Sequence, residues 1–355
     1  MSSMTKECVR EGHGWRGMLA WLTFALLALI IASLCIGPYP LDFWQAGHIA
    51  AQLALPIPLP DDPGWSFRDQ AVIQVLRLPR VLLAVYVGMA LGVAGAALQG
   101  MMRNPLVGPD LVGVSSGAAC GGVLAIMLNL DGSPPALVGL AFFGGMLALA
   151  CTQGLVRLAK AETNGIALVV AGIFVGALFT AGVSLGYFLA NDRQISRMTD
   201  WLLGTFAHAT PAAVVMVAVP TLIGGSVLMM LRWRFNILSL DNLDIASLGV
   251  KPGGLRWAII VLVSWMVAAQ VSVSGVIAWV GLVAPHAARL LVGPDHRQLL
   301  PASALVGGLF TLLVDDIARG FLKADVPVGV LTTLMGTPLI CWLFWKRKLR
   351  GWNGE

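Results

Sequence analysis

Two arginines, separated by Leu78 and Pro79, stand directly before a long apolar run in the stretch RLPRVLLAVYVG (77–88). A guanidinium group carries a permanent charge and a fork of N–H donors that fits a carboxylate, so Arg77 and Arg80 could bind an acidic partner. The same residue type also anchors helix ends at a membrane surface, because its long side chain reaches the headgroups. Taken alone, the two arginines favour the anchoring interpretation.

A second charged motif, DDIAR (315–319), ends another apolar run. Asp315 and Arg319 are four residues apart, so on a helix they can pair on one face, either as a structural ion pair or as a functional one. Carriers driven by an ion gradient place carboxylates near the middle of the membrane. Because this motif lies at the rim of its run, coupling to protons or sodium is disfavoured.

Enzymatic chemistry finds little support. The sequence has no HExxH or P-loop motif, so the usual zinc-protease and nucleotide-binding signatures are missing. His286 stands alone in VAPHAARLL, which favours a structural histidine over a ligand or a base. The 5 cysteines are dispersed without a CxxC spacing, which supports neither a metal site nor a disulfide framework. We expect no catalytic residue, metal or cofactor in this chain.

Small residues recur at helical spacing in GVSSGAACGG (113–122). The residues concerned are Gly113, Ser115, Ser116, Gly117 and Gly121. The glycines form two overlapping GxxxG steps, which is typical of closely packed membrane helices. A channel wall lined by glycine and hydroxyl groups is the alternative.

The composition sets the class of protein. Of 355 residues, 57% are hydrophobic and 12% are charged, and 41 are glycine. A soluble domain carries about 25% charged residues, so this chain is predicted to be an all-α polytopic membrane protein. The net charge of +5 is scattered in short clusters, which sets membrane orientation and gives no argument for nucleic acid.

About ten segments are apolar enough for membrane helices, each of which needs about 20 residues. They lie near 18–36, 79–98, 111–128, 136–157, 166–190, 212–231, 256–274, 276–292, 300–314 and 327–345. The first is long for a signal sequence and is interpreted as a retained span. The short segments 276–292 and 300–314 could instead be half-spans. Spans two to five and seven to ten resemble each other weakly, which suggests halves related by an inverted repeat.

Lysine and arginine positions predict the orientation. Placing both termini in the cytoplasm puts most of the 23 basic residues inside, as the positive-inside rule requires. Residues 1–17 and 347–355 are then cytoplasmic tails around a transmembrane domain at 18–346. Residues 37–70 form a Pro-rich external segment, and residues 191–206 form an external amphipathic helix. The cytoplasmic loop 232–254 carries apolar residues at helical spacing, which indicates a surface for a partner.

At this point the motifs form a recognisable combination. The stretches RLPRVLLAVYVGMALGVAGAALQGMMRNPLVGPDLVGVSSGAA (77–119), GVIAWVGLVAPHAARLLVGPDHRQLLPASALVGG (275–308), DDIAR and VPVGVLTTLMGTP (326–338) resemble permease subunits of binding-protein-dependent ABC importers for iron-siderophores, haem and vitamin B12. The resemblance runs from about residue 70 to 346. It implies a ten-helix subunit of the bacterial inner membrane. Such subunits work as a homodimer or a similar heterodimer, with two cytoplasmic ATPases and a periplasmic binding protein.

The resemblance also implies residue roles. It places a cytoplasmic gate at Asn104 and Leu106 of the NPL turn, with a second constriction near Thr163 and Asn164. It places the ATPase-coupling helices at 237–250, with the apolar positions Ile237, Leu240, Leu243, Ile245 and Leu248. It makes Arg77, Arg80 and Arg319 the docking groups for carboxylates of the binding protein. ATP and magnesium would be bound by the ATPase.

The predicted function is therefore a permease for a large metal chelate, such as an iron-siderophore, haem or cobalamin. The alternative is an ion-coupled carrier or a channel that works without an ATPase. A secreted binding protein and a P-loop ATPase encoded nearby would favour the first.

Overall fold

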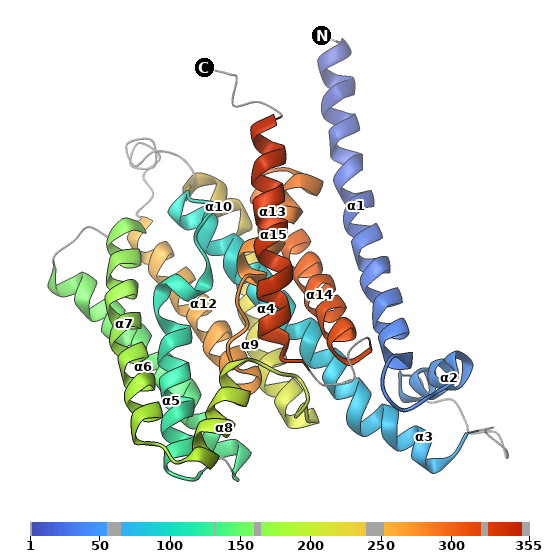
Figure 1. Cartoon of the computed structure of the whole chain (residues 1–355). Helices are drawn as coiled ribbons and strands as arrows, with labels where there is room; N and C mark the ends of the chain where they lie inside the picture. The colour runs from blue at the N-terminus through green and yellow to red at the C-terminus, as the bar shows by residue number, and fades with distance from the viewer. Residues whose placement is uncertain are drawn as a thin grey trace.

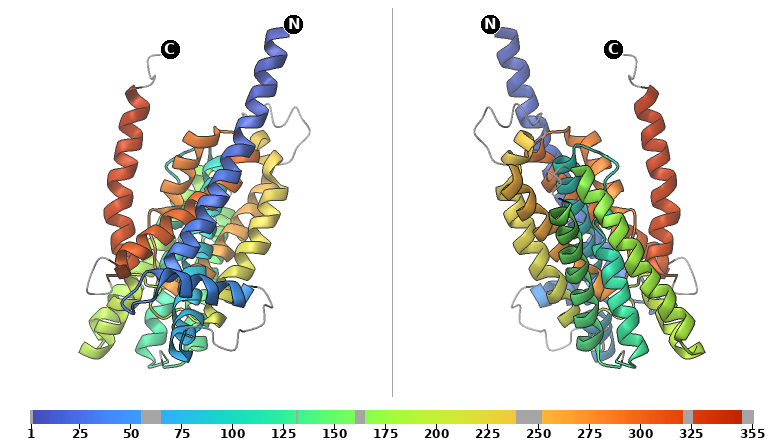
Figure 2. Two further views of the ribbon diagram at one scale, coloured as in Figure 1. Left: turned by 90° about the vertical axis from the view of Figure 1, so that its right-hand side faces the viewer. Right: turned by 90° about the vertical axis from the view of Figure 1, so that its left-hand side faces the viewer.

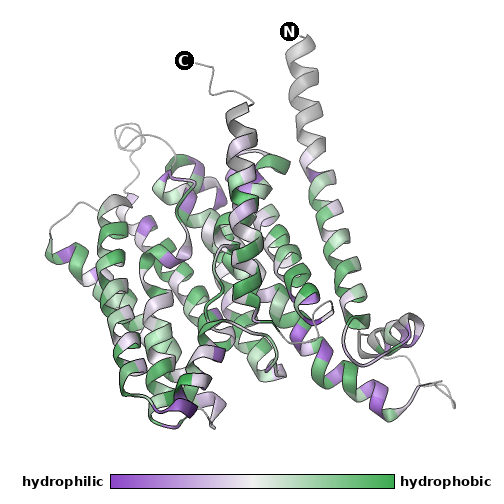
Figure 3. Cartoon of the chain, viewed as in Figure 1, coloured by the Kyte–Doolittle hydropathy of each residue, from purple (hydrophilic) through white to green (hydrophobic). Residues whose placement is uncertain are grey.

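The computed structural model describes residues 2–54, 65–130, 132–159, 165–238, 252–320 and 326–349, and in these ranges every regular element is a helix. Seven helices are long and apolar enough to cross a membrane, and three shorter apolar helices accompany them. By length and hydropathy, the seven long helices cover Trp15–Cys35, Phe67–Met102, Pro134–Leu158, Ala167–Leu189, Pro211–Met230, Pro252–Ser274 and His296–Gly320. Hydrophobic residues cover most of their length, and polar residues gather toward the two ends of the bundle (Figure 3).

The helix order follows the chain. The first half comprises α1 (Ser2–Cys35), α2 (Phe43–Ala54), α3 (Phe67–Ala71), the π-helical turn η1 (Val72–Arg77), α4 (Leu78–Met102), the 3₁₀ turn η2 (Pro109–Val112), α5 (Val114–Met127), α6 (Pro134–Leu158) and α7 (Gly165–Leu189). The second half comprises α8 (Asp192–Leu202), α9 (Pro211–Met230), α10 (Arg232–Leu238), α12 (Pro252–Ser274), α13 (Val280–Val292), α14 (His296–Gly320) and α15 (Val328–Leu349).

The two ends of the bundle differ. Both termini and α10 lie at one end, which we call the α10 end, whereas α8, α2 and α3 lie toward the other, which we call the α8 end (Figure 1). α4 is the central helix, because 83% of its most apolar window is buried, against 22% for α1 and α7. α15 leans away from the bundle toward its C-terminal end (Figure 2). The functional motifs at the two ends of α4 are therefore held by the most enclosed helix of the fold.

Glycines let α4 pack directly on its neighbours. A Cβ atom on Gly88 would lie 2.2 Å from the carbonyl oxygen of Gly307 in α14, and one on Gly95 would lie 1.8 Å from the carbonyl oxygen of Gly281 in α13. Real Cβ atoms do not approach so closely, so only glycine permits this backbone contact. The α4–α14 and α4–α13 interfaces therefore require glycine at these positions of α4.

One expectation about a segment needs correction, and two other segments gain detail. The alternative of a half-span at 300–314 is wrong, because α14 runs for 25 residues from His296 to Gly320. Its end was misplaced because Asp315 and Arg319 are charged, yet both are buried and paired. The segment 37–70 contains the helix α2, whose Ala46 and Ile49 pack on Ile73. Helix α1 also starts at Ser2, inside the predicted N-terminal tail.

Other expectations agree with the structure. The amphipathic helix expected within 191–206 is α8, whose N-terminus is capped by the Asn191 side chain at 3.0 Å from the Gln194 amide. The short segment at 276–292 is the 13-residue helix α13. The segment at 111–128 contains η2 and the 14-residue helix α5. Irregular turns at membrane depth are tolerated where they are buried in protein or line a cavity.

Candidate functional site

The RLPR motif sits where a continuous helical rod changes its winding. Helix α3 begins at a capping box, in which Ser66 and Asp69 each accept a hydrogen bond from the other's backbone N–H. The π-helical turn η1 follows, with the Leu78 amide bonded to the carbonyl of Ile73. Because Pro79 has no N–H, the ordinary ladder is interrupted here, and a wider turn accommodates the gap. The turn directs Arg77 and Arg80 toward different neighbours.

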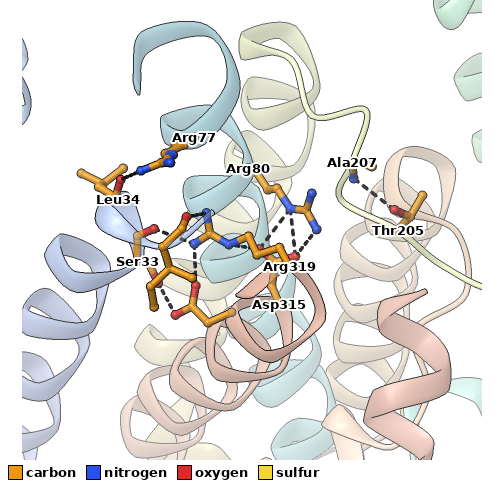
Figure 4. Close-up of polar contacts among 10 residues, drawn as sticks. Ser33, Leu34, Arg77, Arg80, Thr205, Ala207, Asp315 and Arg319 are labelled. Atoms are coloured by element: carbon orange, nitrogen blue, oxygen red, sulfur yellow. Dashed lines mark hydrogen bonds and ion pairs between the residues drawn. The ribbon is translucent and has the colours of Figure 1, made fainter. Parts of the chain in front are cut away.

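Arg80 reaches across to α14. Its Nε lies 3.0 Å from Asp315 Oδ1, and its Nη2 lies 2.9 Å from the same oxygen. On the other side of Asp315, Arg319 Nε lies 3.4 Å from Oδ2. Asp315 has no exposed surface, so this carboxylate is enclosed between two guanidinium groups (Figure 4). A buried carboxylate needs such partners, because ionised groups are costly to remove from water.

Arg77 and Arg319 hold the C-terminal end of α1. Arg77 Nη1 donates to the Leu34 carbonyl at 2.7 Å, and Arg319 Nη2 donates to the Ser33 carbonyl at 2.7 Å (Figure 4). Arg319 Nη1 also donates to the Ile36 carbonyl at 2.9 Å. The last carbonyls of a helix have no partner within it and carry the negative end of its dipole. The two arginines therefore act as a C-terminal cap supplied by α4 and α14.

Ser33 and Asp316 complete this cluster. The Ser33 hydroxyl donates to Asp316, and Asp316 pairs with Arg319. We call Ser33, Arg77, Arg80, Asp315, Asp316 and Arg319 the arginine cluster. Sequence reasoning missed Ser33, because a single serine in an apolar helix carries no local signal for a contact with α14.

The three arginines also share one recess. A cavity of about 300 Å³ is lined by Arg77, Arg80 and Arg319, together with residues that follow α1 and α8. The side chain of Arg80 is 14% exposed, whereas Arg77 and Arg319 are 5% and 7% exposed as whole residues. Nearby, Tyr39 Oη donates to Asp69 Oδ1 at 2.8 Å, and this bond raises the pKa of Tyr39. The sequence predicted that these arginines belong together, and the structure brings them together around a hollow.

The NPL turn lies at the opposite end of α4. Arg103 adopts a left-handed conformation with φ 51° and ends the helix, and the Asn104 Oδ1 accepts a hydrogen bond from the Leu106 amide at 2.9 Å. This local turn leaves Leu106 55% exposed. An exposed leucine on a tight turn is suited to contact a second surface. The other predicted gate residues, Thr163 and Asn164, lie outside the described residues.

The start of the predicted coupling segment touches this turn. Arg103 Nε donates to the Leu238 carbonyl of α10 at 2.9 Å, and Phe235 and Leu238 are fully buried. Ile237 is half-buried in the same helix. The remaining predicted coupling positions, Leu240, Leu243, Ile245 and Leu248, lie outside the described residues. The contact between α4 and α10 had no signal in the sequence, because it depends on a backbone carbonyl.

The glycine stripe of α5 packs against two helices. A Cβ on Gly117 would lie 2.4 Å from the Gly144 carbonyl oxygen, and one on Gly121 would lie 2.2 Å from the Leu140 carbonyl oxygen, both in α6. Gly113, at φ 83°, faces Gly172 of α7 in the same way. Ser115 donates to Asp110 at 2.7 Å, and Ser116 lies near Gly176. The close backbone approaches are those of a packing surface.

The described residues hold no group of three or more histidine, cysteine, aspartate or glutamate side chains that could bind a metal ion. His286 is 2% exposed, in the first half of α13, where it has a contact partner. This is the environment expected of a structural histidine.

Known proteins are similar to this chain over nearly its whole length. The family model described as the FecCD transport family matches residues 25–346. The molybdate import system permease protein MolB of Haemophilus influenzae is 40% identical over 95% of this chain and 97% of its own length. The cobalamin import system permease protein BtuC of Halobacterium salinarum is 37% identical over 94% of this chain and 97% of its own.

A solved structure agrees. A metal-chelate type ABC transporter in an inward-facing conformation superposes with a TM-score of 0.82 at 38% identity, over 93% of this chain and 99% of that one. The family match at residues 25–346 spans the positions of both the arginine cluster and the NPL turn.

Proposed function

We propose, on the premise that the chain belongs to the FecCD transport family and is a multi-pass import permease, that it carries a metal chelate or a metal oxyanion delivered by a binding protein. The observation that carries this proposal is the match at 40% identity and at a TM-score of 0.82 over nearly the whole chain. The relatives named above import molybdate and cobalamin, so the substrate class is a metal-containing compound held by a separate receptor.

The recess of the arginine cluster supports a docking role. Three guanidinium groups face one hollow of about 300 Å³, and two carboxylates of the chain, Asp315 and Asp316, already occupy part of their donor capacity. The remaining positive charge attracts acidic side chains and accelerates encounter with them. Arg80, the most exposed of the three, is the expected first contact for a carboxylate of the binding protein.

The α10 end is the proposed site for the ATPases. α10 leads directly into the segment that carries the predicted coupling positions, and Arg103 links it to the NPL turn. Movement of an ATPase against this segment would be transmitted to the C-terminal end of α4. In this arrangement both termini lie in the cytoplasm, the binding protein docks at the α8 end, and ATP and magnesium are bound outside this chain.

Helix lengths support an internal duplication. α4, α5, α6 and α7 have 25, 14, 25 and 25 residues, and α12, α13, α14 and α15 have 23, 13, 25 and 22. In both series the short helix follows a turn with a positive φ, at Gly113 and at Trp279. Inverted repeats of this kind place the transport pathway at their interface.

A second copy of the chain is the proposed partner in the membrane. α7 exposes large apolar side chains along its length, including Phe174 at 64% and Leu178 at 70%, and α15 exposes Leu334 at 64%. Lipid could cover these residues, but a homodimer would place the pathway between two copies. Cross-linking single cysteines at position 178 or 334 in native membranes tests this arrangement: bands of twice the chain mass support it.

Reconstitution tests the function. The chain, its ATPase and its binding protein are placed in liposomes, and uptake of radiolabelled molybdate and cobalamin is measured with and without ATP. ATP-dependent uptake that requires the binding protein supports the proposal. Uptake by the chain alone, driven by a proton or sodium gradient, would instead establish an ion-coupled carrier.

A further inference from the structure

A second cavity lies at the α10 end and was not anticipated from the sequence. It has a volume of about 530 Å³ and is lined by the last turn of α4, the NPL turn, α10, α13 and the start of α14. The side chains that face it include Gln99, Arg103, Asn236, Arg289, Asp295 and His296. This set is unusual for the interior end of an apolar bundle, because it combines two guanidinium groups with amides and an imidazole.

Two polar atoms of this lining lack partners. Gln99 Nε2 and His296 Nε2 are buried and have no hydrogen-bond partner in the part of the chain that the structure describes. Gln99 is 2% exposed and His296 is 6% exposed. A buried donor or acceptor without a partner costs about 1–3 kcal/mol, so such atoms are usually satisfied by water or by a ligand.

The orientation of both side chains is fixed by further bonds. Gln99 Oε1 accepts from Arg289 Nη2 at 3.2 Å, which turns the amide nitrogen of Gln99 away from that guanidinium. His296 Nδ1 lies 3.1 Å from Asn236 Oδ1, and the His296 backbone amide donates to the same oxygen at 3.1 Å. The His296 ring also stacks on Phe235 with centroids 5.6 Å apart. Neither side chain can turn to find a partner elsewhere without losing these contacts.

The charges of the lining favour an anion. Two guanidinium groups, Arg103 and Arg289, face one carboxylate, Asp295. Asp295 Oδ1 is already engaged, because it accepts from Asn236 Nδ2 at 2.8 Å and from the Arg297 amide at 2.9 Å. It thereby caps the N-terminus of α14, the positive end of a 25-residue helix.

We propose that this cavity binds a small tetrahedral oxyanion of the phosphate or molybdate type. Arg289 and Gln99 would donate to its oxygens. The depth of Gln99 and His296 favours an ion over a protein side chain, because the whole recognition group must fit inside. Free phosphate and an oxyanion delivered by transport share this chemistry. An ion bound beside Arg103 and Asn104 would contact the NPL turn and so could change its conformation.

Equilibrium dialysis of the purified full-length chain in detergent tests the proposal, with radiolabelled phosphate and molybdate as separate probes. Saturable binding of either ion that weakens at least tenfold in Arg289→Gln supports it. Arg234→Gln is the matched control, because Arg234 is an exposed arginine of α10 that does not line the cavity. This control should bind as the unmodified chain does.

Gln99→Leu removes the unpartnered amide and decides the matter if Arg289→Gln does not fold. Binding of phosphate and molybdate alike identifies a general oxyanion site, and binding of molybdate alone identifies a site for the delivered ion. No saturable binding of either probe overturns the proposal. Unchanged binding in both Arg289→Gln and Gln99→Leu overturns it as well.

Discussion

Arg80 of α4 holds Asp315 of α14 through Nε and Nη2, which lie 3.0 and 2.9 Å from the same carboxylate oxygen. The two residues are 235 positions apart in the chain, and Asp315 is completely buried. The contact joins the two helices whose glycines already touch at Gly88 and Gly307. The ion pair therefore closes one end of an interface that close backbone packing forms further along.

Replacing Asp315 by asparagine should destabilise the protein strongly. The amide would leave Arg80 without its carboxylate and Arg319 with Asp316 alone, and breaking one partner of a buried pair costs about 3–5 kcal/mol. Thermal unfolding in detergent should show a clearly lower midpoint for Asp315→Asn. Asp200→Asn is the control, because Asp200 is exposed on α8. A midpoint equal to that of the control would mean that the pair contributes little.

Arg80 and Arg77 should respond differently to substitution by glutamine. Arg80 has the exposed edge, so Arg80→Gln should weaken docking of the binding protein about tenfold, with a loss that shrinks as salt screens the charge. It should also lower the unfolding midpoint, because it breaks the buried pair with Asp315. Arg77 caps α1, so Arg77→Gln should clearly lower the thermal unfolding midpoint and should change the docking affinity little. Surface plasmon resonance at several salt concentrations measures the affinity. Unchanged docking in Arg80→Gln would assign the whole cluster to structure.

The sequence predicted the class and most spans, because apolar runs and repeated glycines carry strong local signals. The grouping of the three arginines followed from the family resemblance of their motifs. The sequence did not predict that Arg77 and Arg319 cap α1, since the acceptors are backbone carbonyls that any sequence provides. The sequence also predicted an end for α14 that is too early, at residue 314 instead of Gly320, for a related reason. Charged residues mark the end of a span only when they reach water, and Asp315 and Arg319 are neutralised inside the protein instead.

Gly95→Ala should disrupt the fold. Its Cβ would meet the Gly281 carbonyl oxygen at 1.8 Å, so α4 and α13 would have to separate, and overpacking of this kind costs about 1–3 kcal/mol or more. Gly139→Ala in α6 is the matched control, because nothing lies within 4 Å of its Cβ position. Alanine should even stabilise that helix by about 0.5–1 kcal/mol. Thermal midpoints of the two variants should move in opposite directions, and equal shifts would refute the packing argument.

Arg103→Gly should weaken the stimulation of ATP hydrolysis by the loaded binding protein. Glycine accepts the left-handed conformation at φ 51° more readily than arginine, so the helix end should persist. The substitution removes the bond from Nε to the Leu238 carbonyl at 2.9 Å, which joins the NPL turn to α10. In the reconstituted complex the ATPase should still co-purify, while stimulation of hydrolysis by the loaded binding protein should fall several-fold. The control is Arg234→Ala, which removes an exposed arginine of α10 without placing a glycine inside the helix. This variant should keep the stimulation. Full stimulation in Arg103→Gly would show that coupling takes another route through the bundle.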